Sequence, residues 1–516
     1  MKKSVSYIYI FTSACLSALT LIFPKFLFPF QFVFMIPLCI FLYKTDLDGK
    51  KIYRMGFLYF YLFGLVCFCW FWSLYPLDFA GFSKFSALAV ILLAWLGIPL
   101  LQAITGGFVF LIFAKFKKRI NRHDHIILPL LFSALYTLWE FSLYVGWWGV
   151  PWGISALGQS EFSPTLSLVS FVGAQGLSFI IVLANFALAL VILKFKEIKV
   201  YILPGVITAV CLILILFANN GIKTESSIKA AAIQPNISSQ EKWQGTLDDE
   251  FEKHVILTKQ AANEGAKIVL WSETALNFNF DSSPLYKEKM SSLAKECDID
   301  IYFGTFEYTE NASYNVIMRV KKDGSIDKNI YKKRSLVPFG EYVPARKIMT
   351  ALAPFLEDIS MLSEDLSPGC NASIFSQNDF YVGPLICFDS IYPFNAQSAA
   401  KDGANIIFLA TNDSWFGTSA AVYMHLYQSK LRAAEVGRYV VRSANTGISA
   451  IITNKGKTVD LCEPESFGYV CKDVEILSGQ TFFTAFPYLA LIISASIPLL
   501  TFLYILIDRK KAANKQ

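Results

Sequence analysis

The sequence predicts a polytopic α-helical membrane protein of eight spans, with one α/β domain inserted before the last span. The chain has 516 residues, of which 54% are hydrophobic and only 17% are charged, whereas soluble chains carry about 25% charged residues. The apolar excess is confined to residues 6–218 and 481–507, while residues 223–478 have the composition of a globular protein. We therefore expect a membrane domain over residues 1–222, a globular domain over 223–478, and a final span with its tail over 479–516.

The eight predicted spans follow from the length of the apolar runs. A bilayer core of about 30 Å requires roughly 20 apolar residues per helix. Stretches that reach or approach this length lie at residues 6–22, 27–43, 55–75, 86–114, 126–146, 165–193, 200–218 and 481–507. Lys2 and Lys3 before the first run also suit a signal peptide, but the run continues to Ile22 and further spans follow it. A retained first span is therefore favoured.

Basic residues alternate between successive loops and predict the orientation. They gather before the first span, in every second loop after it, and in the tail; Lys117, Lys118 and Arg119 are examples, and the intervening loops hold almost none. Cytoplasmic loops are the ones enriched in Lys and Arg. Both termini are thus expected in the cytoplasm and the globular domain on the outer face. The same loops account for the net charge of +6, so no nucleic-acid partner is expected.

Polar residues inside the spans are expected to face protein. Glu140, near the outer end of the fifth span, is costly in lipid and should face protein or water. Gln175, Ser178 and Asn185 in the sixth span are expected to pack helices together rather than to bind lipid head groups. The aromatic loop 147–152 suits a membrane interface and is interpreted as part of a wall for lipid entry.

Cysteine and histidine spacing predicts neither a metal site nor a cofactor. None of the ten cysteines forms a pair with zinc-ligand spacing, and the four histidines form no cluster along the chain. Cys462 and Cys471 lie nine positions apart around a predicted hairpin. Outside the cytoplasm these two thiols are candidates for a disulfide.

Strand and helix patterns alternate in the globular region, which predicts a layered α/β fold. Strands are expected over residues 228–234, 267–271, 300–305, 314–320, 380–387, 405–410, 439–443 and 448–453. Helices are expected over 247–264, 285–296 and 420–437, with tight turns at 323–324 and 454–456.

Three polar residues follow predicted strands, and each has both a structural and a catalytic interpretation. Glu273 suits a general base, because partial burial raises a carboxyl pKa toward the working range, and it equally suits a helix cap. Lys333 alone reads as a surface lysine, and Cys387 alone reads as a core residue. A nucleophilic cysteine needs a group that lowers the thiol pKa and another that receives the developing oxyanion.

Together and in this order, the three residues resemble the Glu–Lys–Cys pattern of the nitrilase, or carbon–nitrogen hydrolase, superfamily. The tracts that carry the resemblance are WSETAL, YKKRSLVPFGEYVP and GPLICFDSIYP. The resemblance implies an αββα sandwich in which Glu273 is the base, Lys333 stabilises the oxyanion and Cys387 forms a thioester. Lys332 fits less well, since the family pattern has one residue between the tyrosine and the lysine. Glu341 matches the second glutamate that orders the site.

The whole chain, with seven spans before this domain and one after it, resembles the apolipoprotein N-acyltransferase family over essentially its full length. The resemblance implies transfer of an acyl chain from a membrane phospholipid to the α-amino group of a diacylglyceryl-modified cysteine at the N-terminus of an apolipoprotein. It also implies a bacterial inner membrane and a periplasmic catalytic domain. Supporting roles fall to Phe388 and Asp389, and substrate contacts to Trp152, Trp243 and Trp415.

The sequence departs from the usual family pattern at four positions. Ser272 replaces a proline, Ser335 replaces a histidine, and Phe388-Asp389 stands where Tyr-Glu is common. These departures bear on rate and substrate preference more than on reaction class, because the three catalytic positions are present.

Two alternative functions remain open at this point. A membrane-anchored nitrilase-type amidase would use water as the acceptor, and the additional spans and the aromatic loop weigh against it. A non-catalytic transporter or scaffold would not need Glu273, Lys333 and Cys387.

Overall fold

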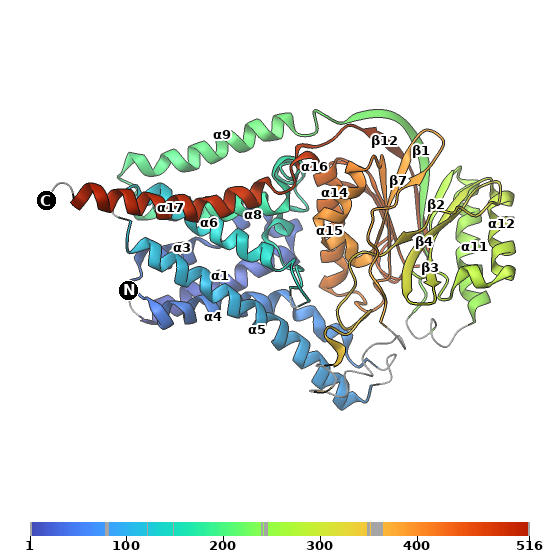
Figure 1. Cartoon of the computed structure of the whole chain (residues 1–516), viewed down its shortest axis with the longest axis horizontal. Helices are drawn as coiled ribbons and strands as arrows, with labels where there is room; N and C mark the ends of the chain where they lie inside the picture. The colour runs from blue at the N-terminus through green and yellow to red at the C-terminus, as the bar shows by residue number, and fades with distance from the viewer. Residues whose placement is uncertain are drawn as a thin grey trace. The chain divides into compact units, whose positions relative to one another are not determined.

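The computed structural model describes residues 3–77, 82–120, 122–147, 149–238, 241, 246–347, 351 and 365–513. The chain divides into two compact units, which are described separately. One, the helical unit, comprises Met1–Trp72, Ala89–Ala218 and Phe486–Gln516. The other, the α/β unit, comprises Ser73–Leu88 and Asn219–Ala485. Figure 1 shows the helices and strands of both units.

Eight helical segments of the described chain are long and apolar enough to cross a membrane, which confirms the predicted number of spans. They are Ser4–Ile22, Pro24–Lys44, Gly49–Leu74, Lys84–Lys117, Asp124–Ser142, Val169–Leu193, Ile198–Phe217 and Leu489–Lys511. The helices that form them include α1 (Lys3–Ile22), α3 (Ile36–Lys44), α4 (Gly49–Cys67), α5 (Lys84–Lys117), α6 (Asp124–Ser142), α8 (Val169–Leu193), α9 (Ile202–Phe217) and α17 (Leu489–Ala513).

Glu140 and Asn185 face protein, as predicted. Glu140 is 1% exposed and accepts hydrogen bonds from the backbone N–H and the hydroxyl of Ser155, at 2.8 and 2.6 Å. Asn185 accepts a bond from the Met35 N–H at 2.9 Å and donates to the Gln31 carbonyl at 2.9 Å. These bonds satisfy polar groups that lipid could not, so they join the helices to one another.

The α/β unit contains two six-stranded sheets. The first has the order β12-β1-β2-β3-β4-β5 and consists of β1 (Lys223–Gln234), β2 (Ile268–Leu270), β3 (Asp300–Tyr308), β4 (Ser313–Val320), β5 (Tyr331–Lys332) and β12 (Gly468–Ser478). The second has the order β11-β10-β9-β8-β7-β6 and consists of β6 (Phe375–Ser376), β7 (Tyr381–Ile386), β8 (Ile406–Thr411), β9 (Val440–Ala444), β10 (Ala450–Ile452) and β11 (Thr458–Leu461).

Helices cover the outer face of each sheet, which gives the four layers of an αββα sandwich (Figure 1). The first sheet packs on α11 (Leu247–Asn263) and α12 (Pro284–Cys297), and the second on α14 (Pro393–Lys401) and α15 (Ala420–Val436). Side chains alternate along β1: Ala230 and Ala232 pack between the sheets, whereas Ala231 packs toward the helices. This period of two is what a strand buried on both faces requires. The predicted sandwich is confirmed.

The strand β12 was not predicted, and its geometry overturns the proposed disulfide. Cys471 on β12 packs in the outer core beside α11 and α12, whereas Cys462 lies against the core between the sheets. Both thiols are free. The two thiols therefore lie on opposite faces of the first sheet.

Three consecutive strands are parallel in each sheet, and this arrangement positions the candidate site. Strand β2 pairs in parallel with β1 and β3, and β8 pairs in parallel with β7 and β9. The segments that follow parallel strands emerge at one edge of a sheet, and ligands commonly bind there. Glu273 follows β2, Cys387 follows β7, and Asn412 follows β8.

Candidate active site

Cys387 occupies a sharp turn from strand to helix. It directly follows β7 and begins a short 3₁₀ helix, Cys387–Ile391. Its φ of 46° lies in the left-handed region, which residues other than glycine rarely adopt and which costs on the order of 1 kcal/mol or more. Burial raises the pKa of the Cys387 thiol above its usual range; the charge of Glu273 adds to the rise and Lys333 opposes it. The resting thiol therefore keeps its proton at neutral pH and needs a base.

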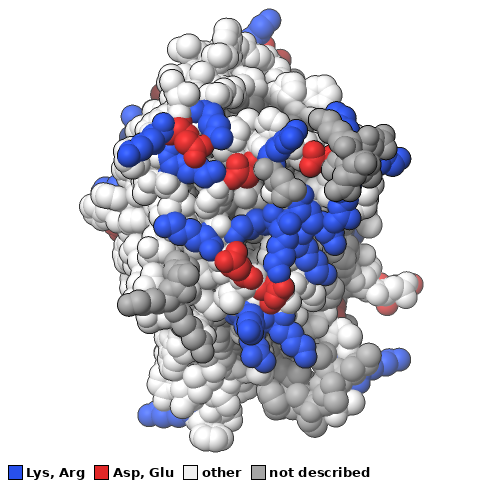
Figure 2. Space-filling view, turned by 90° about the vertical axis from the view of Figure 1, so that its left-hand side faces the viewer, with Lys and Arg blue, Asp and Glu red and all other residues white. Residues whose placement is uncertain are grey.

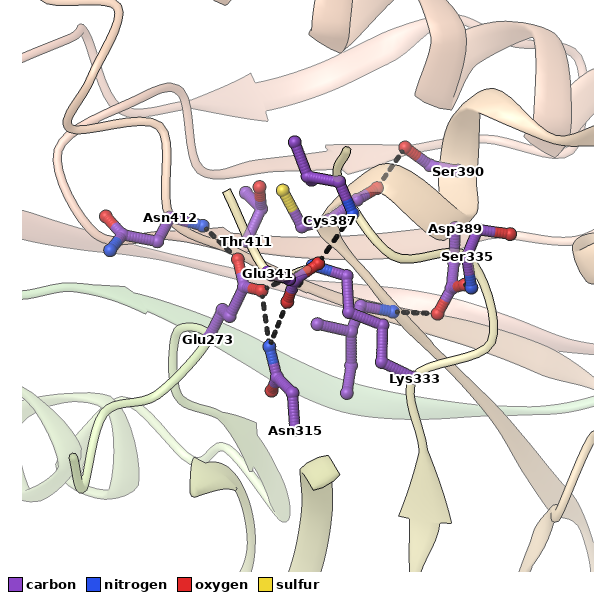
Figure 3. A network of polar contacts seen from close by, with 12 residues as sticks. Glu273, Asn315, Lys333, Ser335, Glu341, Cys387, Asp389, Ser390, Thr411 and Asn412 are labelled. Carbon is purple, nitrogen blue, oxygen red and sulfur yellow. Dashed lines mark hydrogen bonds and ion pairs between the residues drawn. The ribbon is translucent and has the colours of Figure 1, made fainter. Parts of the chain in front are cut away.

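Glu273 is 6% exposed and is held by three donors. Its Oε1 accepts bonds from Lys333 Nζ at 2.9 Å and Asn315 Nδ2 at 2.8 Å, and its Oε2 accepts from the Asn412 N–H at 2.9 Å (Figure 3). The alternative interpretation as a helix cap is not met, since a turn follows Glu273 and the next helical segment, Phe280–Ser282, is capped by Asn279. The carboxylate is fixed in one orientation inside the site.

Lys333 is 2% exposed and lies between two carboxylates. Its Nζ is 2.9 Å from Glu273 Oε1 and 2.9 Å from Glu341 Oε1. Burial alone would lower the pKa of Lys333, but the two carboxylates outweigh it and hold that pKa well above its usual range. The ammonium group is therefore a permanent cation at physiological pH.

The neighbouring Lys332 has different surroundings, and the structure separates the two lysines. Lys332 Nζ pairs with Glu307 at 2.6 Å and lies 3.9 Å from the centre of the Tyr314 ring. It is thus satisfied by another carboxylate, away from the pair that holds Lys333.

Asn315 was missed by the sequence interpretation and joins the two carboxylates. It lies near the start of β4, and its Nδ2 donates to Glu273 at 2.8 Å and to Glu341 at 3.1 Å. Glu341 Oε2 also accepts the Val337 N–H at 2.8 Å, which fixes the loop after Lys333. In the sequence, Asn315 precedes the apolar run Val316–Met318, but β4 also holds Ser313 and Arg319, so the amide alone is a weak signal.

Asp389 joins the Lys333 loop to the Cys387 turn. Its Oδ1 accepts the N–H groups of Arg334 and Ser335 at 3.2 and 2.7 Å. Its Oδ2 accepts the Ile386 N–H at 3.1 Å and the Tyr331 hydroxyl at 2.8 Å. Burial raises the pKa of the Asp389 carboxyl to about 6, against the opposing effect of Lys333. Ser335, where the family has histidine, contributes through its backbone and accepts a bond from Asn395 at 2.8 Å.

A second polar cluster lies behind Cys387. Ligand-type atoms of Cys387, Asp413 and His425 come within 4.8 Å of one another, a grouping that histidine spacing did not predict because the three residues come from separate elements. Arg442 Nη2 donates to Asp413 at 2.6 Å, and His425 Nδ1 lies 2.8 Å from the same carboxylate. Burial raises the pKa of Asp413, but His425 and Arg442 outweigh it and lower that pKa to about 2.

The three tryptophans predicted to bind substrate occupy different surroundings. Trp152 belongs to the helical unit and is 3% exposed, with its ring 5.3 Å from that of Trp70. Trp415 is half-buried after β8, close in the chain to Asn412. Trp243 lies outside the described residues. Their contacts with substrate stay predictions. Phe388 is buried, and its ring lies edge-on to Tyr392 at 5.6 Å.

Comparison with known proteins agrees with both units. The family described as "Carbon-nitrogen hydrolase" matches residues 229–476, and the "Apolipoprotein N-acyltransferase N-terminal domain" matches residues 17–187. The apolipoprotein N-acyltransferase of Shewanella oneidensis is 29% identical over 453 residues, or 83% of each chain. That of Borreliella burgdorferi is 28% identical over 374 residues, or 69% of this chain and 70% of the relative. A solved nitrilase-superfamily structure from Saccharomyces cerevisiae is 18% identical, with a TM-score of 0.39 over 49% of this chain and 91% of that chain. With the N-terminal domain of the family and a carbon–nitrogen hydrolase domain on one polypeptide, the chain belongs to the apolipoprotein N-acyltransferase family.

Proposed function

We propose that this acyltransferase moves an acyl chain from a membrane phospholipid to the α-amino group of a diacylglyceryl-cysteine apolipoprotein, through a thioester on Cys387. One observation carries the proposal. A half-buried cysteine, a buried carboxylate and a buried lysine lie at the strand ends of a carbon–nitrogen hydrolase fold, in a chain whose described residues include eight apolar helices. The relatives named apolipoprotein N-acyltransferase supply the substrate class.

In the first half-reaction, Glu273 takes the proton of the Cys387 thiol and the sulfur attacks the ester carbonyl of the lipid. A carbon–sulfur bond forms and the carbonyl oxygen becomes an oxyanion, which Lys333 Nζ and the Phe388 N–H stabilise. Such donors are most effective in a water-poor site, where charges are weakly screened. The carbon–oxygen ester bond then breaks, Glu273 returns the proton to the leaving oxygen, and a lysophospholipid departs.

In the second half-reaction, the amine of the acceptor attacks the thioester. Glu273 removes a proton from the amine and an amide bond forms. The carbon–sulfur bond breaks, and Glu273 returns the proton to the sulfur, which regenerates the thiol and the carboxylate. Splitting the transfer into two steps explains the need for a thiol, because a thioester is reactive enough for an amine to displace it. Each substrate then needs to occupy the site only in turn, which predicts ping-pong kinetics.

The proposal is tested with purified full-length protein, radiolabelled phosphatidylethanolamine and a diacylglyceryl-cysteine peptide. Triacylated peptide is expected as the product. Release of free fatty acid at the same rate with and without the peptide would instead identify a hydrolase that uses water, and would refute the transfer.

The orientation in the membrane is also proposed. The chain is a bacterial inner-membrane protein by its apolar helices and its relatives. Lys44, Lys117 and Lys511 lie in the last turns of α3, α5 and α17. Figure 2 shows Lys and Arg side chains gathered on the face toward which Figure 1 marks both chain ends. A face rich in Lys and Arg suits the cytoplasmic side.

Reporter fusions test this orientation. A periplasmic reporter such as alkaline phosphatase, fused after Asn220, is expected to be active, and the same reporter fused after Lys118 to be inactive. A fluorescent protein that matures only in the cytoplasm should give the reverse pattern. Cytoplasmic activity at Asn220 would contradict the proposed orientation.

The acylation rate is expected to depend on pH near pH 6, because Asp389 titrates there. Ionised, its carboxylate accepts five hydrogen bonds, from the Lys333 loop, the Cys387 turn, Tyr331 and Asn395. Since its pKa is raised to about 6, protonation displaces one donor as pH falls through that value, and acylation should fall with it. The effect on folding has the opposite sign: a raised carboxyl pKa means that ionisation costs stability as pH rises from about 4 to 6.

Asp389→Asn tests this assignment. An amide presents N–H to donors on one side, so acylation should fall on the order of tenfold to a hundredfold, the scale of a misplaced catalytic group. The acylation rate of the variant should no longer change with pH near pH 6. If the rate of the variant kept the same pH dependence, the titrating group would be another residue.

A further inference from the structure

The backbone carbonyl of Cys387 is held by two side chains of the cluster behind it. Ser390 Oγ donates to this carbonyl oxygen at 2.8 Å, and His425 Nε2 lies 3.2 Å from it. Ser390 Oγ and His425 Nε2 are themselves 3.1 Å apart. Figure 3 shows the Ser390 bond reaching the turn from the side opposite to Glu273. A main-chain oxygen beside the nucleophile is thus fixed by groups that the proposed chemistry does not use.

The role of His425 Nε2 follows from the atoms that face the ring. Nδ1 faces Asp413 Oδ1 at 2.8 Å and Arg442 Nη2 at 3.3 Å, and Nε2 faces the Cys387 carbonyl at 3.2 Å. A carbonyl can only accept, so Nε2 is the donor in this contact. Asp413 is in turn held by Arg442 at 2.6 Å, and His425, Asp413 and Arg442 are each at most 1% exposed.

Holding this carbonyl also fixes the N–H on the other side of the same peptide. The bond between Cys387 and Phe388 is not among the cis peptides of the described chain, so its C=O and N–H point in opposite directions within one plane. Any rotation of the plane moves both groups. Cys387 has a φ of 46°, where the backbone is strained and would relax without external restraint.

We propose that His425, oriented by Asp413, is a positioning residue for the oxyanion hole. With Ser390 it holds the Cys387 carbonyl and thereby aims the Phe388 N–H at the oxygen that becomes negative when the lipid ester is attacked. The inference rests on the proposed thioester chemistry. His425 and Asp413 each have a ligand-type atom within 4.8 Å of the Cys387 sulfur, and the inferred role acts through the backbone carbonyl and not through the sulfur. It predicts that His425 matters for reactions that build an oxyanion and not for reactions that need only the sulfur.

Two reactions of the same thiol test this distinction. Acylation by phospholipid forms an oxyanion, whereas alkylation by iodoacetamide displaces iodide at carbon and forms none. Both rates are measured on full-length protein by intact mass, and their ratio is compared between variants. His425→Leu should lower the acylation rate on the order of 10- to 100-fold, somewhat less than the loss on deleting an oxyanion donor itself. Its alkylation rate should stay within about threefold of the rate of the unmodified protein. The ratio of acylation rate to alkylation rate should therefore fall.

Conservative and control variants sharpen the test. His425→Gln keeps an N–H donor near Nε2 and should restore most of the acylation rate. Ser390→Ala removes a single donor and should lower acylation several-fold with alkylation unchanged; it also serves if His425→Leu does not fold. His254→Leu is the matched control, because His254 is equally buried but lies on α11 against the Trp271 ring. Its ratio of acylation to alkylation should not change.

The outcomes separate this inference from the proposed function. If the unmodified protein forms no acyl adduct with phospholipid, the thioester mechanism fails and the inference fails with it. If the unmodified protein is acylated but His425→Leu and Ser390→Ala lower acylation and alkylation equally, these residues only place the sulfur, and the inference alone is overturned. Unchanged acylation in both variants overturns it as well.

Discussion

Cys387→Ala protein is expected to form no acyl-enzyme and no triacylated product. The unmodified protein, incubated with phospholipid alone, should gain the mass of one acyl chain, and neutral hydroxylamine should remove it. Alanine has no atom to form the carbon–sulfur bond, so neither mass change should occur. Cys387→Ser should be nearly as inactive, since a hydroxyl is a far weaker nucleophile than a thiolate at neutral pH and Glu273 is a weak base for it.

The matched control is Cys370→Ala. Cys370 is exposed in the same α/β unit, so its loss should leave the adduct and the product unchanged. Initial rates measured while lipid and peptide are both varied should give parallel double-reciprocal lines. Intersecting lines together with an active Cys387→Ala protein would mean direct transfer between the two lipids, and the nucleophile would have to be assigned elsewhere.

The fold was largely predictable because its strongest signals are local. Apolar runs of bilayer length gave the spans, and alternating strand and helix patterns gave the layers. The strand β12 escaped because its pairing with β1 joins segments more than 200 positions apart, from Lys223↔Ser478 to Gln234↔Gly468. The strands β5 and β6 have two residues each and exist only through their neighbours. The helix α14 begins at Pro393 and buries mainly alanines, which give a weak periodic signal.

The candidate site was predictable only for the residues that lie in recognisable sequence motifs. Glu273, Lys333 and Cys387 were found through the resemblance of their tracts, and the structure brings their elements together. Asn315 and His425 were missed because each acts through contacts between distant elements: Asn315 bridges two carboxylates, and His425 reaches a backbone carbonyl. Their own elements give little signal, because other polar residues, such as Arg319 on β4 and Lys430 on α15, stand beside them in the sequence.

Lys333→Met should lower acylation on the order of 10² or more, the loss seen when one oxyanion donor is removed. It should also destabilise the α/β unit, because Glu273 and Glu341 would then face Asn315 as two buried charges without a cation. Removing one partner of a buried ion pair costs about 3–5 kcal/mol. The raised pKa of Lys333 means that its charge supports folding at every pH below the unfolded value of about 10.4, so the deficit should be present throughout the neutral range.

A second substitution separates the two effects of Lys333. In Lys333→Met with Glu341→Gln, one unpaired carboxylate becomes neutral, so the free energy of unfolding should recover by a large part of the loss. Acylation should not recover, since no cation faces the oxyanion. Lys332→Met is the matched control. Lys332 pairs with Glu307, and their side chains are 33% and 21% exposed, so this ion pair is more accessible to solvent. Stability and acylation should both change little when it is removed. Urea unfolding and acyl-adduct formation would be measured on the same preparations. If the double variant regained acylation together with stability, Lys333 would be a structural counter-ion only, and the oxyanion would need another donor.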